Sequence, residues 1–224
     1  MKTTKNLLAA VALSVGLLSA TGANAVLTLS ADGTVVNDTD LNINWLANAN
    51  LAASNTFGVS GINANGTMNW NTAQSWIGAM NASNSGTGYL GFSDWRLANA
   101  DPSCGFSYNC TGSEMGHLFY NELGGVAGQS ILITHNTNLN LFQNVQSYYY
   151  WSGTEYAPGP TSAWTFTSHG GQDAPSKNNL LFAWAVRPGQ IAAVTAPVPE
   201  PEIYAMLLAG LGLLGVARRR LTLR

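Results

Sequence analysis

The stretch LLFAWAVRPG, residues 180–189, has the pattern of a buried strand. Successive side chains of an extended backbone point to opposite faces, so the stretch divides into a bulky face and a small face. The bulky face consists of Leu180, Phe182, Trp184 and Val186, and the small face consists of Leu181, Ala183 and Ala185. A strand that is apolar on both faces is covered on both. The stretch therefore predicts a central strand packed on both sides.

Three further segments predict antiparallel β-structure. SYYYWSGTEY (147–156) and SAWTFTS (162–168) precede the central strand and are rich in aromatic and β-branched residues. Near the start of the chain, GTVVNDTDLNINWLA (33–47) alternates in the same way. It predicts a hairpin with Asn37-Asp38 near its turn.

Two helices are expected between these strands. In NTAQSWIGAMNAS (71–83), which would begin at a capping Asn71, one apolar stripe is made by Ala73, Trp76, Ile77 and Met80. TGSEMGHLFYNELGG (111–125) has the capping-box pattern Thr111 and Glu114, and it ends at two glycines. Helices that are separated along the chain from the strands predict an α+β fold, with two helices packed on antiparallel sheets.

The N-terminus has the layout of a secretory signal peptide. Lys2 and Lys5 precede an apolar core from Leu7 to Leu18, and Ala23-Asn24-Ala25 forms an A-x-A cleavage site. We therefore assign residues 1–25 to a signal peptide with a helical core and expect the protein to be exported.

The C-terminus has three parts in a fixed order. Pro199-Glu200-Pro201 precedes an apolar stretch over residues 203–217, and Arg218-Arg219-Arg220 follows. The arginines favour a cytoplasmic location for this end. The plain interpretation is a single-pass membrane anchor.

The same order of parts closely resembles a PEP-CTERM sorting signal, which we place at residues 199–224. In that family the Pro-Glu-Pro motif precedes a short transmembrane helix and a basic cluster, and an exosortase processes the chain at the motif. The resemblance implies a Gram-negative bacterium that makes exopolysaccharide. It also implies that the inner membrane holds the protein until processing moves it to the cell surface or the extracellular matrix.

Composition limits the partners. Only 9% of the chain is charged, and between residues 26 and 198 nine acidic and three basic side chains give a net charge of about −6. Binding to nucleic acid needs several Lys or Arg side chains at phosphates. The sequence therefore excludes nucleic acid as a partner and argues against sulfated polyanions.

The two cysteines, Cys104 and Cys110, lie six residues apart in SCGFSYNC. A close pair in an exported protein predicts a disulfide, because the compartment is oxidising. Their spacing is not that of a zinc site, and the chain has no second pair.

Residues 34–189 resemble the Lcl C-terminal-domain family. The motifs that match in order are a W-x-x-A helix, D-W-R-L, an E-x-x-x-L helix, Y-W-S-G-T and a closing V-R-P. The resemblance implies a C-type-lectin-like fold in which two helices flank antiparallel sheets and the N- and C-terminal strands pair. We take residues 26–190 as this domain and residues 191–198 as a linker. Structural roles are expected for the motif residues Asp94, Trp95, Arg96, Trp151 and Arg187.

No catalytic motif and no metal motif stands out. The histidines His117, His135 and His169 form no H-x-x-x-H pattern, so a zinc site would have to be assembled from distant segments. We therefore predict no resident cofactor, with calcium at Asp38-Thr39-Asp40 as the alternative to a simple Asx turn there. Because Arg96 and Arg187 lie between apolar residues, we expect them to pair with carboxylates or carbonyls.

The best candidates for ligand binding are Trp95, Glu155 and Tyr156, which could stack on sugar rings and bond their hydroxyls. The sequence thus favours a non-catalytic surface or matrix protein that binds glycan or exopolysaccharide. A polysaccharide-modifying hydrolase and a self-associating structural surface protein remain the alternatives.

Overall fold

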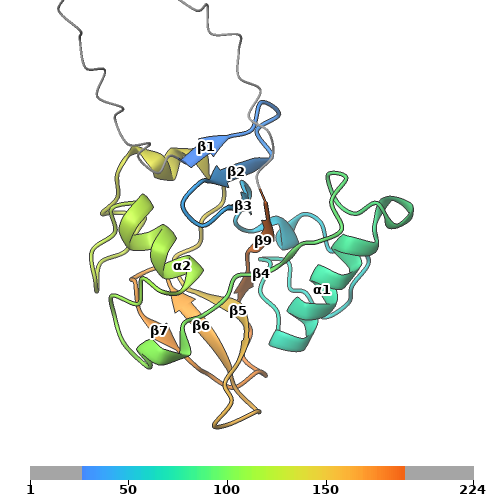
Figure 1. The fold of residues 1–224 in the computed structure, drawn as a ribbon. Coiled ribbons are helices and arrows are strands. Elements are labelled where there is room, and N and C mark those ends of the chain that lie inside the picture. The colour runs from blue at the N-terminus through green and yellow to red at the C-terminus, as the bar shows by residue number, and fades with distance from the viewer. Residues whose placement is uncertain (1–26, 190–224) are drawn as a thin grey trace, which may run out of the picture.

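An antiparallel sheet of five short strands pairs the N-terminal hairpin of the domain with its last strand (Figure 1). Its order is β1-β2-β3-β9-β4, with β1 at Leu27–Leu29, β2 at Val35–Asp38, β3 at Ile43–Leu46, β9 at Ala185–Pro188 and β4 at Arg96–Leu97. The predicted N-terminal hairpin is β2–β3. Strand β3 pairs with the last strand, β9, with Trp45 opposite Val186.

A second sheet lies at the other end of the molecule (Figure 1). Its order is β7-β6-β5-β8, with β7 at Gln172–Asp173, β6 at Ala163–Thr167, β5 at Tyr149–Glu155 and β8 at Phe182–Ala183. The pairs β5–β6 and β6–β7 are antiparallel, whereas β5 and β8 run parallel. The segments 147–156 and 162–168 form β5 and β6, as the sequence predicts.

The stretch 180–189 is buried over residues 181–186, whereas Leu180 is 50% exposed, and it is not one strand. Phe182–Ala183 belongs to the second sheet and Ala185–Pro188 belongs to the first, so the chain changes sheets at Trp184. The Trp184 indole Nε1 donates to the Leu46 carbonyl at 2.8 Å. Alternation along the sequence could not reveal this division, because a strand that crosses between two sheets is covered on both faces throughout.

The first helix, α1, spans Trp70–Ala82 and buries the predicted stripe against the sheets. Its N-cap is Asn69, whose side chain accepts from the Thr72 N–H, so the predicted cap at Asn71 was wrong. Helix α2 spans only Glu114–His117 and continues as the π-helical turn η4 (Leu118–Glu122). Its N-cap is Ser113, which accepts from the Gly116 N–H at 3.0 Å.

The predicted capping box of α2 was wrong as well. Glu114 does not fold back onto the backbone at Thr111. Instead its carboxylate accepts from both terminal nitrogens of Arg96, at 2.7 and 2.6 Å, and from the Asn99 N–H. A bidentate ion pair is stronger than a bond to one backbone N–H, and it ties α2 to β4.

Short 3₁₀ turns complete the domain, at Leu51–Ala53, Asn84–Gly86, Pro102–Cys104 and Thr137–Leu141. The structure describes residues 27–189. The expected signal helix, the linker 191–198, the motif Pro199-Glu200-Pro201 and the C-terminal transmembrane helix lie outside that range. Among the described helices, none has the length and apolar character needed to cross a membrane.

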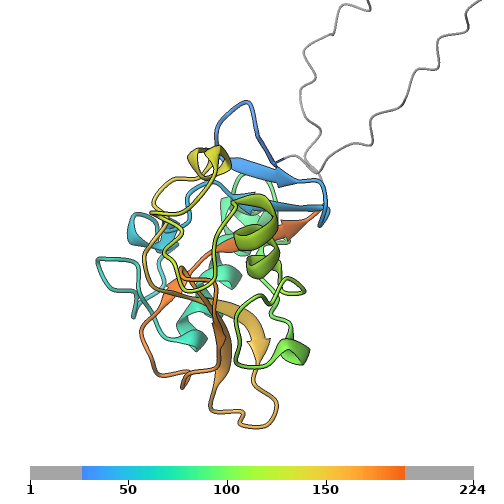
Figure 2. The ribbon, with the colours of Figure 1, turned by 90° about the vertical axis from the view of Figure 1, so that its left-hand side faces the viewer.

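Figures 1 and 2 show that both ends of the described chain lie at the end of the molecule that holds the first sheet. Two hydrogen bonds hold the second of these ends: the Gly189 N–H donates to the Asn42 carbonyl, and the Asn44 side chain donates to the Gly189 carbonyl. Strands β5–β7 and the chain around Cys104 lie at the far end (Figures 1 and 2). A domain held through its C-terminus would therefore present the second sheet outward.

We expect Trp184→Ala to lower the free energy of unfolding by about 3–5 kcal/mol, because it empties a large volume between the two sheets. Trp184 is 5% exposed and contacts Trp45, Phe142 and Tyr150 with ring centroids 5.2 to 5.5 Å apart. Urea unfolding followed by tryptophan fluorescence measures the loss. The matched control is Leu180→Ala in the same stretch, at a side chain that is 50% exposed, and it should change stability by less than about 0.5 kcal/mol. Equal effects of the two substitutions would contradict the role of Trp184.

Candidate functional site

An open groove of about 550 Å³ lies between the disulfide loop and the edge of the second sheet. It is lined by Phe106, Ser107, Tyr108, Tyr149, Thr167, His169, Gly171, Gln172 and Asp173. A smaller hollow of about 190 Å³ continues it past Tyr148, Asn179 and Leu181 and shares Tyr149 and Asp173 with it. The larger volume falls within the range of about 300–1,000 Å³ that is typical of ligand pockets.

The disulfide forms one wall of this groove. Cys104 and Cys110 are bonded, as the sequence predicts, and their Cα atoms lie 5.6 Å apart. The loop they close runs beside β7, where Tyr108 bridges to Gly171 and the Gln172 N–H donates to the Ser107 carbonyl at 2.8 Å. The loop thus extends the second sheet by a short additional edge.

The side chain of Gln172 fixes the loop from beneath. It is 4% exposed, accepts from the Asp101 N–H at 3.1 Å, and donates to the carbonyls of Asp101 at 2.7 Å and Gly105 at 3.2 Å. Both ends of the amide are therefore satisfied by loop backbone. Gln172 positions the wall of the groove and has no donor left for a ligand.

Aromatic rings are exposed along the groove. Phe106 is 57% exposed, Tyr108 is 50% and Tyr148 is 52%. Tyr148 and Tyr149 pack edge to face, with ring centroids 5.1 Å apart. Burial, and then the negative charge of Asp173, raise the pKa of the Tyr149 phenol, so its hydroxyl stays protonated at neutral pH and can donate a hydrogen bond. The surface combines apolar ring faces with hydroxyl and carboxylate groups.

Of the three predicted ligand residues, Glu155 and Tyr156 are at least partly exposed. Glu155 is exposed and forms an ion pair with Lys177, whose ammonium lies 4.3 Å from the centroid of the Trp70 ring. Tyr156 is half-buried against Trp164 and against Phe106 of the groove, with ring centroids 5.2 and 5.4 Å apart. Tyr156 therefore borders the groove through Phe106, and neither residue lines it.

Trp95 is buried and cannot stack on a ligand, which contradicts its predicted ligand role but agrees with the structural role expected of its motif. This side chain is 2% exposed, and its indole N–H donates to the Tyr89 carbonyl at 3.0 Å. It lies beside α1, where Asn81 bonds both its backbone N–H and its carbonyl. D-W-R-L reads like an exposed turn in sequence, but a ring this large in a short segment is used to fill the core.

The remaining motif residues have packing or pairing contacts. Trp151 is fully buried and donates to the Met68 carbonyl at 2.9 Å. Arg187 forms two hydrogen bonds to Asp94, at 2.8 and 3.1 Å, and lies over the Phe92 ring. Arg96 pairs with Glu114. Each of the three cationic side chains within residues 27–189 is therefore in an ion pair.

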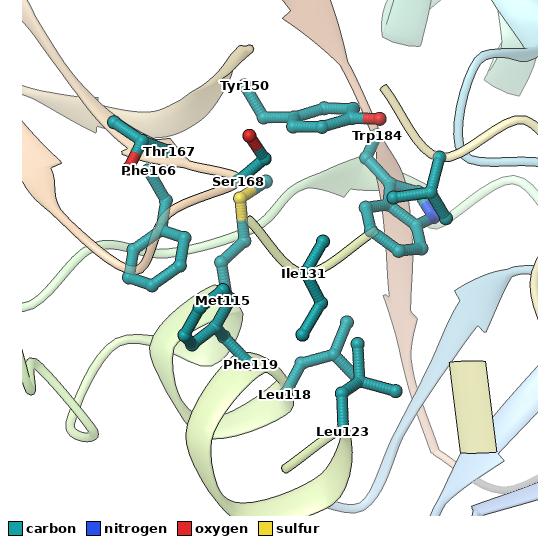
Figure 3. A pocket seen from close by; sticks show the side chains of 11 residues that line it. Met115, Leu118, Phe119, Leu123, Ile131, Tyr150, Phe166, Thr167, Ser168 and Trp184 are labelled. Atoms are coloured by element: carbon teal, nitrogen blue, oxygen red, sulfur yellow. The ribbon is translucent and has the colours of Figure 1, made fainter. Parts of the chain in front are cut away.

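A separate void lies inside the domain, between α2–η4 and the second sheet (Figure 3). Its volume is about 40 Å³, and its walls are almost entirely apolar, formed by residues such as Met115, Leu118, Ile131 and Trp184. This space is too small for an organic ligand. Ser168, whose Oγ lies 3.2 Å from Nδ1 of His169, is one of the residues that line this void (Figure 3), and it is not among those that line the groove.

Sequence reasoning missed the groove residues Phe106, Tyr108, Tyr149 and Asp173. One signal was available in the stretch SCGFSYNC: two aromatic residues among the five that separate the bonded cysteines have no room to be buried. The pairing of this loop with β7 was not available, because the two segments are some sixty residues apart and neither has a pattern that identifies the other.

Comparisons with known proteins agree with the motifs. A family model described as Lcl C-terminal domain matches residues 34–187. A model described as PEP-CTERM protein-sorting motif matches residues 197–220, which include Pro199-Glu200-Pro201. No curated protein matches the chain significantly.

We expect Gln172→Ala to destabilise the protein by about 1–3 kcal/mol, because it leaves loop N–H and carbonyl groups buried without partners. Hydrogen exchange at residues 101–110 should accelerate by at least tenfold, since the loop loses its support. The matched control is Gln143→Ala, at an exposed position outside the groove. Unchanged exchange in Gln172→Ala would show that the disulfide alone orders the loop.

Proposed function

Because the chain belongs to the Lcl C-terminal domain family and ends in a PEP-CTERM sorting motif, we propose that it is a non-catalytic surface or matrix protein that binds neutral polysaccharide. The sorting motif implies that the protein is exported, anchored in the membrane before processing, and processed by an exosortase, a membrane protease-like enzyme. The ligand is the proposed part. The groove between the disulfide loop and β7 is the site we assign to it.

The observation that carries this proposal is the row of exposed aromatic rings beside a carboxylate. Tyrosine presents an apolar face and a polar tip, which suits a sugar ring with its C–H face and its hydroxyl rim. Asp173 accepts hydrogen bonds from hydroxyls, and the Tyr149 phenol donates to them. Both side chains line the groove.

Charge supports a neutral ligand over an anionic one. The three cations of residues 27–189 are each paired with a carboxylate, at Glu114, Glu155 and Asp94. Asp173 adds a negative charge to the groove itself. A sulfated or uronic-acid polymer would meet this carboxylate without a cation to balance it.

The content of the groove also supports binding without catalysis. Glycoside hydrolysis uses two carboxyl groups about 5–10 Å apart on either side of the scissile bond. Asp173 is the one carboxylate among the residues that line the groove. His169 lines the groove, whereas its neighbour Ser168 lines the internal void, so the two do not form a Ser-His pair that faces the groove.

We further interpret the α+β arrangement as C-type-lectin-like. The pairing of β3 with β9 supports this, because it joins the N- and C-terminal strands at one end of the domain. The two ends of the described chain lie at that end, and β7, whose residues line the groove, lies at the other (Figure 1). A protein tethered through its C-terminus would hold its binding surface away from the membrane.

Retention on the exopolysaccharide of the producing organism tests the proposal. The full-length chain, purified in detergent, should be retained by the immobilised polymer without reducing the size of that polymer. Tyr108→Ala should weaken retention by at least tenfold, because it removes an exposed ring from the groove. Leu29→Ala, a similarly exposed apolar side chain on β1 at the opposite end, should leave it unchanged. A drop in polymer size would favour the hydrolase instead.

A second candidate function is self-association. Three exposed apolar side chains lie in one loop after η4: Val126 at 44%, Leu132 at 41% and Ile133 at 83%. Exposed apolar side chains that cluster in this way often mark an interaction surface. Absence of retention, together with concentration-dependent sedimentation that Ile133→Ser abolishes, would favour this candidate.

Processing at the sorting motif is tested separately. Intact-mass analysis of the protein from its native host should give a chain that ends near residues 199–201. Substituting Glu200 by Ala should leave the chain unprocessed and in the membrane fraction. A wild-type mass that still includes Arg224 would contradict processing and leave a plain membrane anchor.

A further inference from the structure

A second polar cluster lies far from the groove, where the N-terminal hairpin meets the helix. Asp38 at the end of β2, His117 at the end of α2 and Glu122 at the end of η4 each bring one ligand atom within 4.8 Å of the others. The sequence predicted that a zinc site would need distant segments, and this cluster joins residues about eighty positions apart.

The π-helical turn brings His117 and Glu122 to the same side. In an α-helix, residues five apart are separated by about 140° around the axis. In η4 the Leu123 N–H bonds to the Leu118 carbonyl, five residues back, so the turn is wider and the two side chains align. Single π turns of this kind occur frequently at functional sites.

The distances suit a shared metal ion. Nε2 of His117 lies 3.4 Å from a Glu122 carboxylate oxygen and 3.6 Å from one of Asp40. Four ligands at about 2.1 Å around a tetrahedral ion are separated from one another by about 3.4 Å. Nε2 is buried and has no hydrogen-bond partner, a state that native proteins usually explain by an ion or a water.

The electrostatics of the cluster call for a cation. Asp38 is fully buried and Glu122 is 5% exposed. Burial, and then the charge of Asp38, raise the pKa of the Glu122 carboxyl. A bound metal ion would compensate these buried carboxylates.

Outer contacts hold the ligands in place. Asp38 accepts from the Leu41 N–H at 3.0 Å and from the Trp45 indole N–H at 3.2 Å, which fixes its carboxylate. The Asn121 side chain lies 3.2 Å from Nδ1 of His117. With its amide oxygen turned toward Nδ1 it would accept from the ring N–H, the usual support of a histidine that binds metal through Nε2.

We propose that Asp38, His117 and Glu122, with Asp40 at the rim, bind one divalent first-row transition-metal ion, for which Zn²⁺ is the probe. An imidazole ligand favours this class over Ca²⁺ and Mg²⁺, which take oxygen ligands. The ion ties the β2–β3 hairpin to α2–η4. The site shares Asp38 and Asp40 with the segment for which the sequence left calcium open, and it adds His117 and Glu122 from the helix.

Calorimetric titration of the chelator-treated full-length chain with ZnCl₂ tests this site. We expect one ion per chain and a higher Tm with Zn²⁺ than without it, because the ion binds only the folded state. Co²⁺ in place of Zn²⁺ should give the visible absorption of a four- or five-coordinate ion. CaCl₂ at the same concentration should produce neither effect.

Two variants separate the site from general stability. His117→Ala and Glu122→Gln should each lower Zn²⁺ affinity by at least tenfold. Glu122→Gln removes a buried charge next to Asp38, so its metal-free Tm should equal or exceed that of the wild type. The matched control is His135→Ala, an exposed histidine outside the cluster, which should bind Zn²⁺ as the wild type does. Absence of one-to-one binding, or equal affinity in Glu122→Gln and the wild type, would overturn the proposal, and a preference for Ca²⁺ would overturn the assigned metal class.

Discussion

The chain crosses from one sheet to the other at Trp184, and the rest of the domain is arranged around that crossing. The indole is covered by Trp45 of the first sheet and Tyr150 of the second, and its N–H is bonded to the Leu46 carbonyl. Neither sheet is large enough to bury its inner face alone, since most strands have two to five residues. Trp184 contacts both sheets and so joins them in one hydrophobic core.

The described domain has few charged side chains, and its cations are paired with carboxylates. With three cations in residues 27–189, the protein places each against a carboxylate of a different segment: Arg96 joins β4 to α2, and Arg187 joins β9 to the turn before β4. The Arg96–Glu114 pair holds α2 against β4, and each cation of residues 27–189 has a carboxylate partner. Of the six other carboxylates in this range, Asp173 lines the aromatic groove, and Asp38, Asp40 and Glu122 lie at the cluster beside His117. The last two, Asp32 and Asp101, accept from backbone N–H groups of their own turns.

The groove and the cluster lie in different parts of the fold, and different structural features support them. The groove depends on a loop that a disulfide closes and Gln172 supports, and this loop leaves Phe106 and Tyr108 exposed. Strand β7, which lines the groove, lies at the end of the molecule away from the first sheet (Figure 1). The cluster depends on a widened helical turn and lies at the N-terminal hairpin.

The sequence by itself determined the class of fold, the stripe of α1, the strands β5 and β6, the disulfide and the sorting motif, because each of these is encoded by neighbours in the chain or by a local motif. The tertiary structure alone decided that residues 180–189 serve two sheets, that Trp95 fills the core, and that Glu114 pairs with Arg96 and does not cap its helix. It also decided both candidate sites. The groove joins Tyr108 to Gly171 and the cluster joins Asp38 to His117, and contacts between segments so far apart leave no periodic trace in either one.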